Sequence, residues 1–248
     1  ATLQLPVARF LEMLKDAGLR SMPGTAAEVL DEGVRSILCP DKVTSQRWLD
    51  IMEQAHGVGL RSTATIMFGH VDDARSWVRH WRQVLALQQR TQGFTEVVPL
   101  PFVSAGAPIY RRGGSRPGPT WREALLMHAV LRLTLGHAIP NVQASWVKLG
   151  HQGALQMLSA GANDLGGALI NESITRAAGA THGQVWTPPD MQDAIRSCNR
   201  LPRQRTTLYG QLKEGAVASW GATPVRWTDN TPAGRKENPK YVTRALSQ

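Results

Sequence analysis

The stretch RSTATIMF, Arg61–Phe68, is rich in β-branched residues and is typical of a buried strand. The segment Asp72–Gln89 follows it with apolar residues at helical spacing, and Glu96–Val103 (EVVPLPFV) is a second strand candidate. A strand, a helix and another strand in this order predict a βαβ unit with parallel strands.

The same alternation extends in both directions from this unit. Further helices are expected at Leu3–Gly18, around Trp48–Ala55, and at Trp121–Leu135, Gln152–Ala160 and Pro189–Leu201, with a first helical turn at Thr25–Leu30. Further strands are expected at Leu19–Met22, Asn141–Val147 and Asn163–Gly167. In the Trp121–Leu135 helix, Leu126, Val130 and Leu133 form the stripe predicted to face the core.

About five βα units within residues 1–210 predict an α/β fold, the C-terminal portion of a (β/α)8 TIM-type barrel, because a complete barrel needs eight strands. Residues 211–248 lose the periodicity and are expected to form a basic, flexible C-terminal tail. Residues 196–248 hold ten basic and three acidic residues, whereas the chain as a whole has a net charge of +9.

The composition excludes several classes of protein. Apolar residues make up 42% of the 248 residues, which excludes wholesale disorder, and no apolar run approaches the roughly 20 residues of a membrane span. The N-terminus shows no signal-peptide pattern, so a cytoplasmic location is expected.

A basic tail favours anionic partners in principle, but no nucleic-acid motif accompanies it, so nucleic-acid binding is the weaker interpretation. Two cysteines, Cys39 and Cys198, are too few and too far apart for a metal motif, so no metal ligand is predicted within this chain.

Polar and glycine-containing segments follow the expected strands, and parallel barrels build their active sites at the carboxyl ends of the strands. His70 follows Gly69 at such an end, where a histidine can transfer a proton. Gln143 and Ser145 alternate onto one face of their strand and are expected to face the cavity. Further candidates, which would bind a substrate through side-chain groups or free backbone amides, are Asn163, Asp164, Gly166 and Gly167, with Glu172 nearby.

The motifs PGTAAEVL, ILCPDK, TIMFGH, VPLPF, GANDLGG and GATHG occur in an order that resembles the radical S-adenosylmethionine enzymes of deazaflavin and menaquinone biosynthesis. The resemblance runs from about Leu11 to Gly210, where RQRTTLYG is similar to the end of the family, and it is strongest to the tyrosine-using, CofH-like subunit or half of FO synthase.

This resemblance implies a 4Fe-4S cluster that reduces S-adenosylmethionine to a 5'-deoxyadenosyl radical. The radical cleaves L-tyrosine, and the 4-hydroxybenzyl group joins 5-amino-6-(D-ribitylamino)uracil, a step of coenzyme F-420 biosynthesis. A partner CofG-like radical enzyme then closes the deazaflavin ring. Glu28 and Arg35 would bind S-adenosylmethionine. His182, in GATHG, is a second candidate catalytic histidine beside His70, on the same grounds of position and proton transfer. The structural alternatives are a carboxylate at a helix start for Glu28 and a surface ion pair for Arg35.

The sequence departs from the family in one respect, because the CxxxCxxC motif that holds the cluster is absent. We therefore expect a fragment that is inactive alone. Three alternatives remain open, namely a menaquinone-pathway aminofutalosine synthase or futalosine cyclase, a basic nucleic-acid-binding module, and an inactive scaffold.

Overall fold

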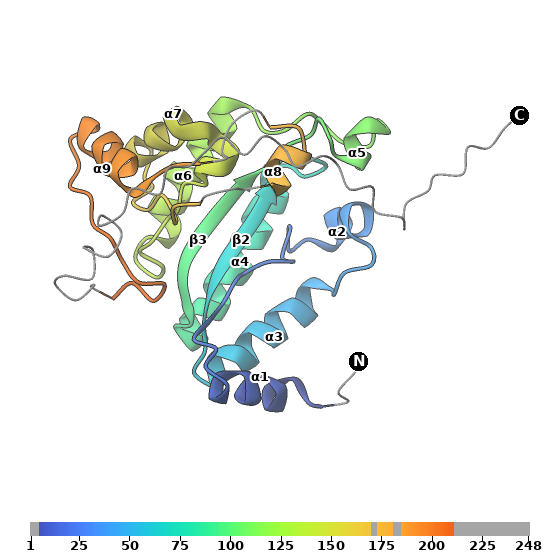
Figure 1. Ribbon diagram of the computed structural model, residues 1–248. Helices are drawn as coiled ribbons and strands as arrows, with labels where there is room; N and C mark the ends of the chain where they lie inside the picture. The colour runs from blue at the N-terminus through green and yellow to red at the C-terminus, as the bar shows by residue number, and fades with distance from the viewer. Residues whose placement is uncertain (1–4, 170–172, 181–184, 211–248) are drawn as a thin grey trace, which may run out of the picture. The chain divides into compact units, whose positions relative to one another are not determined.

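The computed structural model describes residues 5–169, 173–180 and 185–210. Helices and strands alternate along much of this part (Figure 1). The helices are α1 (Val7–Asp16), α2 (Glu32–Leu38), α3 (Ser45–Gly57), α4 (Ala74–Thr91), α5 (Pro108–Arg111), α6 (Trp121–Leu135), α7 (Trp146–Ser159), α8 (Ile174–Ala177) and α9 (Pro188–Ser197). The strands are β1 (Ser21–Met22), β2 (Arg61–Phe68) and β3 (Phe94–Pro101). The predicted βαβ unit is confirmed, with β2 at its predicted bounds and β3 beginning two residues early.

The three strands form a parallel sheet in the order β1-β2-β3. Two single bridges extend it, from Val97 to Val142 and from Gln143 to Asp164. The predicted strand Asn141–Val147 is therefore wrong over its second half, because the chain turns into α7 at Trp146. The structure shows an α/β fold with a parallel sheet, and the described residues do not close it into a barrel.

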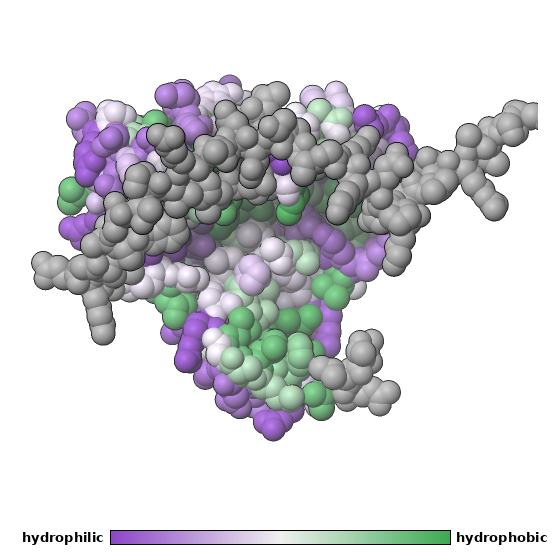
Figure 2. Space-filling model, in the orientation of Figure 1, coloured by the Kyte–Doolittle hydropathy of each residue, from purple (hydrophilic) through white to green (hydrophobic). Residues whose placement is uncertain are grey.

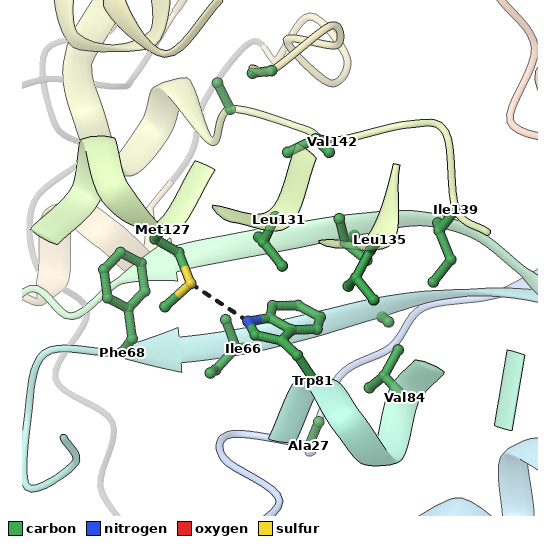
Figure 3. Packing of buried hydrophobic residues seen from close by; sticks show 14 of the residues in the cluster. Ala27, Ile66, Phe68, Trp81, Val84, Met127, Leu131, Leu135, Ile139 and Val142 are labelled. Carbon is green, nitrogen blue, oxygen red and sulfur yellow. Dashed lines mark hydrogen bonds between the residues drawn. The ribbon is translucent and has the colours of Figure 1, made fainter. Parts of the chain in front are cut away.

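The helix-facing side of the sheet carries the hydrophobic core. Trp81 of α4 lies against Ile66 and Met127, and its indole nitrogen donates to the Met127 sulfur at 3.4 Å (Figure 3). Leu131 and Leu135 of α6 pack into the same cluster (Figure 3).

The α6 stripe predicted to face the core is wrong. Leu126, Val130 and Leu133 are exposed, Leu133 to 79%. The opposite face is buried and carries Met127, His128 and Leu131 among others. Both faces contain apolar residues, so periodicity alone could not choose between them.

The predicted helical turn at Thr25–Leu30 is also wrong. Ala26 and Glu28 have left-handed backbone conformations, with φ of 65° and 46°, and the helix begins only at Glu32 after Asp31 caps it. Residues 24–30 therefore form a loop, which lies directly after β1.

The first helix exposes apolar side chains. Figure 2 shows a green, hydrophobic area at the lower end of the view, where Figure 1 places α1. Phe10 and Met13 of this helix are 38% and 46% exposed.

None of the helices that the structure describes combines the length and the apolar character of a membrane span.

Candidate functional site

The sheet has a second face, opposite to the one that the helices cover. Ala64, Ile66 and Phe68 of β2 point into the core, so Thr63, Thr65 and Met67 lie on the other face. Their register partners on β3 are Glu96, Val98 and Leu100. We call this face, defined by these six residues, the inner face.

Three polar side chains donate to Glu96 at the inner face. The Oε2 atom of Glu96 accepts hydrogen bonds from Gln143 Nε2 at 3.0 Å, from Arg205 Nη2 at 3.2 Å and from the Tyr209 hydroxyl at 2.6 Å. Asp164 accepts from Arg205 Nε and lies 2.8 Å from the same hydroxyl. We call Glu96, Gln143, Asp164, Arg205 and Tyr209 the polar cluster.

Burial makes the electrostatics of the polar cluster strong. The side chains of Glu96 and Asp164 are only 9% and 7% exposed, and Arg205 is the cation that pairs with both. Burial, Asp164 and Glu96 raise the pKa of Tyr209 far above its ordinary value, so the phenol keeps its proton. The guanidinium of Arg205 also lies over the Tyr209 ring, 4.0 Å from its centre.

The structure therefore brings together two of the separately predicted candidates, Gln143 and Asp164, which a parallel bridge also pairs. Gly166 lies beside these two residues, since its amide donates to Asp164 Oδ1 at 2.5 Å. Its backbone is in the left-handed region, with a φ of +72°. A β-carbon at Gly166 would lie 3.0 Å from Gln143 Oε1, so only glycine fits this position without a shift. The carbonyl of Gly167 accepts from the Trp146 indole at 3.1 Å, and Ser145 is buried at the start of α7.

Asn163 points away from the inner face, because adjacent residues in an extended segment alternate. Its Oδ1 accepts from Arg132 Nη2 at 2.7 Å and from the Val142 amide at 2.8 Å. Asn163 instead lines a separate hollow of about 370 Å³ between the ends of α6 and α7, together with Arg132 and Arg200.

Glu28 lies in the loop after β1, and its carboxylate pairs with Lys42 at 2.5 Å. Arg35 is 3% exposed, and its guanidinium donates to the carbonyls of Ala27 and Val43. Neither structural alternative drawn from the sequence holds, since Glu28 is not at a helix start and Arg35 forms no surface ion pair among the described residues.

His70 is buried, and both of its ring nitrogens have partners within the turn. Nδ1 accepts from the Val71 amide at 2.7 Å, so Nε2 carries the proton that it shares with the Met67 carbonyl at 2.9 Å. Burial lowers the pKa of His70, which outweighs the opposing effect of Asp72. This geometry leaves no nitrogen free for a substrate, so we leave His70 out of the proposed site. Glu172 and His182 lie outside the described residues.

Three residues of the polar cluster were missed as site residues. Glu96 is the one charged residue in a mostly apolar strand, a signal that could have been used. Arg205 and Tyr209 lie in RQRTTLYG, whose proximity to Glu96 depends on tertiary structure.

The residues present do not fit an iron–sulfur cluster. The chain has two cysteines, and the described residues contain no group of three or more metal-binding side chains. Residues outside this chain would have to hold such a cluster. The polar cluster combines the carboxylate and amide oxygens of Glu96, Asp164 and Gln143, which accept from amino and hydroxyl groups, with the donors of Arg205 and Tyr209.

The comparisons with known proteins agree with the motif order. The family model described as the CofH/MqnC C-terminal region matches residues 91–217. A protein of Methanopyrus kandleri named 5-amino-6-(D-ribitylamino)uracil–L-tyrosine 4-hydroxyphenyl transferase is 52% identical over 203 residues, which are 82% of this chain and 55% of that protein. The FO synthases of Streptomyces avermitilis and Mycobacterium tuberculosis are 45% and 46% identical over 89% and 84% of this chain.

The chain spans just over half the length of the transferase and about a quarter of each FO synthase, 26% and 24%. The family match itself covers about half of the chain. The chain therefore belongs to the CofH/MqnC family, whose C-terminal region it contains.

Proposed function

We propose that this chain is the C-terminal part of a radical S-adenosylmethionine transferase that joins the 4-hydroxybenzyl group of L-tyrosine to 5-amino-6-(D-ribitylamino)uracil. The observation that carries the proposal is the identity of 45–52% to proteins named for this reaction, over more than 80% of the chain. In this proposal the chain forms part of a TIM-type barrel, whose remaining strands and cluster ligands lie outside it, and the assembled enzyme works with a CofG-like partner.

The inner face would bind the aminouracil substrate. This molecule carries amino groups and ribityl hydroxyls, which are hydrogen-bond donors, and the polar cluster offers carboxylate and amide oxygens. Gln143 Oε1, beside Gly166, would orient the uracil while the carboxylates bind its donors. The hydroxyls of Thr63 and Thr65 are hydrogen-bonded to Gly24 instead.

A chimera tests the proposal. The matched 203-residue segment of the Methanopyrus kandleri transferase is replaced by the corresponding segment of this chain. The chimera is reconstituted with iron and sulfide and supplied with S-adenosylmethionine, a reductant, tyrosine and the aminouracil. We expect 5'-deoxyadenosine and the coupled product by mass spectrometry only when tyrosine is present, and neither product from this chain alone. A folded chimera with a filled cluster and no tyrosine-dependent 5'-deoxyadenosine would contradict the proposal.

A second candidate function follows from the family description, which includes both CofH and MqnC. In the same chimera an aminofutalosine synthase would turn over an enolpyruvyl substrate, a futalosine cyclase would turn over a futalosine substrate, and both would ignore tyrosine. Parallel assays with the two substrate sets therefore distinguish the two functions.

A further inference from the structure

The loop of residues 24–30 is held by side chains from three helices. The Trp48 indole of α3 donates to the Thr25 carbonyl at 3.0 Å. His80 of α4 accepts from the Leu30 amide at 3.0 Å, and Gln83 of the same helix donates to the Leu30 carbonyl at 2.6 Å. Arg35 of α2 donates to the Ala27 carbonyl within the loop and to Val43 beyond α2.

The sheet fixes the loop as well. The Gly24 amide donates to Thr63 Oγ1 at 2.7 Å, and the Glu28 carbonyl accepts from the Met67 amide at 2.9 Å. A β-carbon at Gly24 would lie 2.3 Å from the Thr63 carbonyl oxygen, so the loop packs directly against β2.

The conformation of residues 24–30 and the buried polar groups around it lower the stability of the folded chain. Ala26 and Glu28 both adopt the left-handed conformation that L-residues avoid, with φ of 65° and 46°. Arg35 is a buried cation that forms no ion pair among the described residues, and the Nε2 atom of buried His80 has no partner within them. Backbone strain and buried unpaired polar groups persist where a functional conformation is required.

The loop presents one ionisable side chain. Ala27, Val29 and Leu30 are fully buried, while Glu28 stands between them with its carboxylate 18% exposed. The loop lies at the carboxyl end of β1, where parallel sheets bind ligands.

We propose that Arg35 is a positioning residue, which holds the loop of residues 24–30 in its strained conformation so that the Glu28 carboxylate is fixed for an amino or hydroxyl group of a bound ligand. Arg35 therefore acts through Glu28 and does not contact the ligand. This inference rests on the proposed function for the identity of the ligand, an adenosyl amino acid.

The test measures the binding of S-adenosylhomocysteine to the chimera by calorimetry. Arg35→Lys keeps the charge and loses the fork that reaches two carbonyls, and Glu28→Gln removes the carboxylate charge. We expect each to raise Kd about tenfold, the effect of losing one charge-assisted hydrogen bond. The double variant should be no weaker than the poorer single variant, because both changes remove the same interaction. Arg47→Lys, at an exposed position of α3, is the matched control and should leave Kd unchanged.

Hydrogen exchange supplies a readout that does not need the ligand. Amides of residues 26–30 should exchange at least tenfold faster in Arg35→Lys than in the Arg47→Lys control, because the opening free energy of the loop falls. If Arg35→Lys does not fold, Trp48→Phe removes another holding contact and should change both readouts in the same direction.

The outcomes separate the two hypotheses. An unmutated chimera that does not bind S-adenosylhomocysteine would contradict the proposed function. Normal binding with an unchanged Kd in Arg35→Lys, or additive effects in the double variant, would overturn the positioning role alone.

Discussion

The Tyr209 hydroxyl lies within hydrogen-bond distance of both buried carboxylates, Glu96 and Asp164, which it shares with the Arg205 guanidinium. Tyr209→Phe removes this donor. The two carboxylates then keep only Arg205, Gln143 and one backbone amide as hydrogen-bond donors among the described residues. A charge-assisted hydrogen bond contributes about 1.5–3 kcal/mol, and because Tyr209 is only partly buried we expect a loss of about 2 kcal/mol in the free energy of unfolding. For a unit of this size that loss lowers Tm by about 4–8 °C.

Thermal and urea unfolding of the full chain, followed by circular dichroism at pH 8, measure the loss. Tyr110→Phe is the matched control, because Tyr110 lies exposed on the short α5 helix and should change stability by less than about 0.5 kcal/mol. Adding Glu96→Gln to Tyr209→Phe should restore part of the stability, since it removes one of the unbalanced charges. Equal stabilities of Tyr209→Phe and Tyr110→Phe would refute the reasoning.

Three further predictions concern stability. Burial lowers the pKa of His80 to about 3, below its value in the unfolded chain, so the stability contributed by neutral His80 is full above pH 6.5 and falls on acidification. Between pH 7 and pH 5 this effect should lower the free energy of unfolding by about 2 kcal/mol. Urea titrations at the two pH values should show that His80→Asn removes this part of the loss. Leu131→Ala, at a buried position, should lower the free energy of unfolding in urea by about 2–4 kcal/mol, and Leu133→Ala, at an exposed one, by less than about 0.5 kcal/mol. Equal losses would contradict the observed buried face of α6. Gly166→Ala should lower the free energy of unfolding by more than about 1 kcal/mol, because its φ is +72° and its β-carbon would meet Gln143; an unchanged Tm would count against this geometry.

Local patterns predicted much of the fold. β2, α6 and the βαβ unit follow from β-branched runs and helical spacing, and Thr187 caps α9 as the sequence Thr-Pro-Pro-Asp indicates. The errors occur where tertiary contacts decide. The loop of residues 24–30 looks helical in sequence, but Arg35, Trp48 and His80 fix it in another conformation.

The candidate site shows the same contrast between what local patterns predict and what tertiary contacts decide. Gln143 and Asp164 were separate candidates in the sequence, and only the structure shows that a parallel bridge pairs them. Nothing local indicated that Arg205 and Tyr209, more than 40 residues from Asp164, would bind the same carboxylates. Arg35 and His70 carry side chains suited to ligand chemistry, but backbone groups of the fold occupy them, which only the structure could show.

The assignment of the inner face as the aminouracil site is tested most directly by the KM of the chimera for 5-amino-6-(D-ribitylamino)uracil after Gln143→Leu. Losing one hydrogen bond to the substrate should raise this KM about tenfold with S-adenosylhomocysteine binding unchanged. The exposed Gln152→Leu should leave both values unchanged. An unaltered KM in a correctly folded Gln143→Leu chimera would contradict the account.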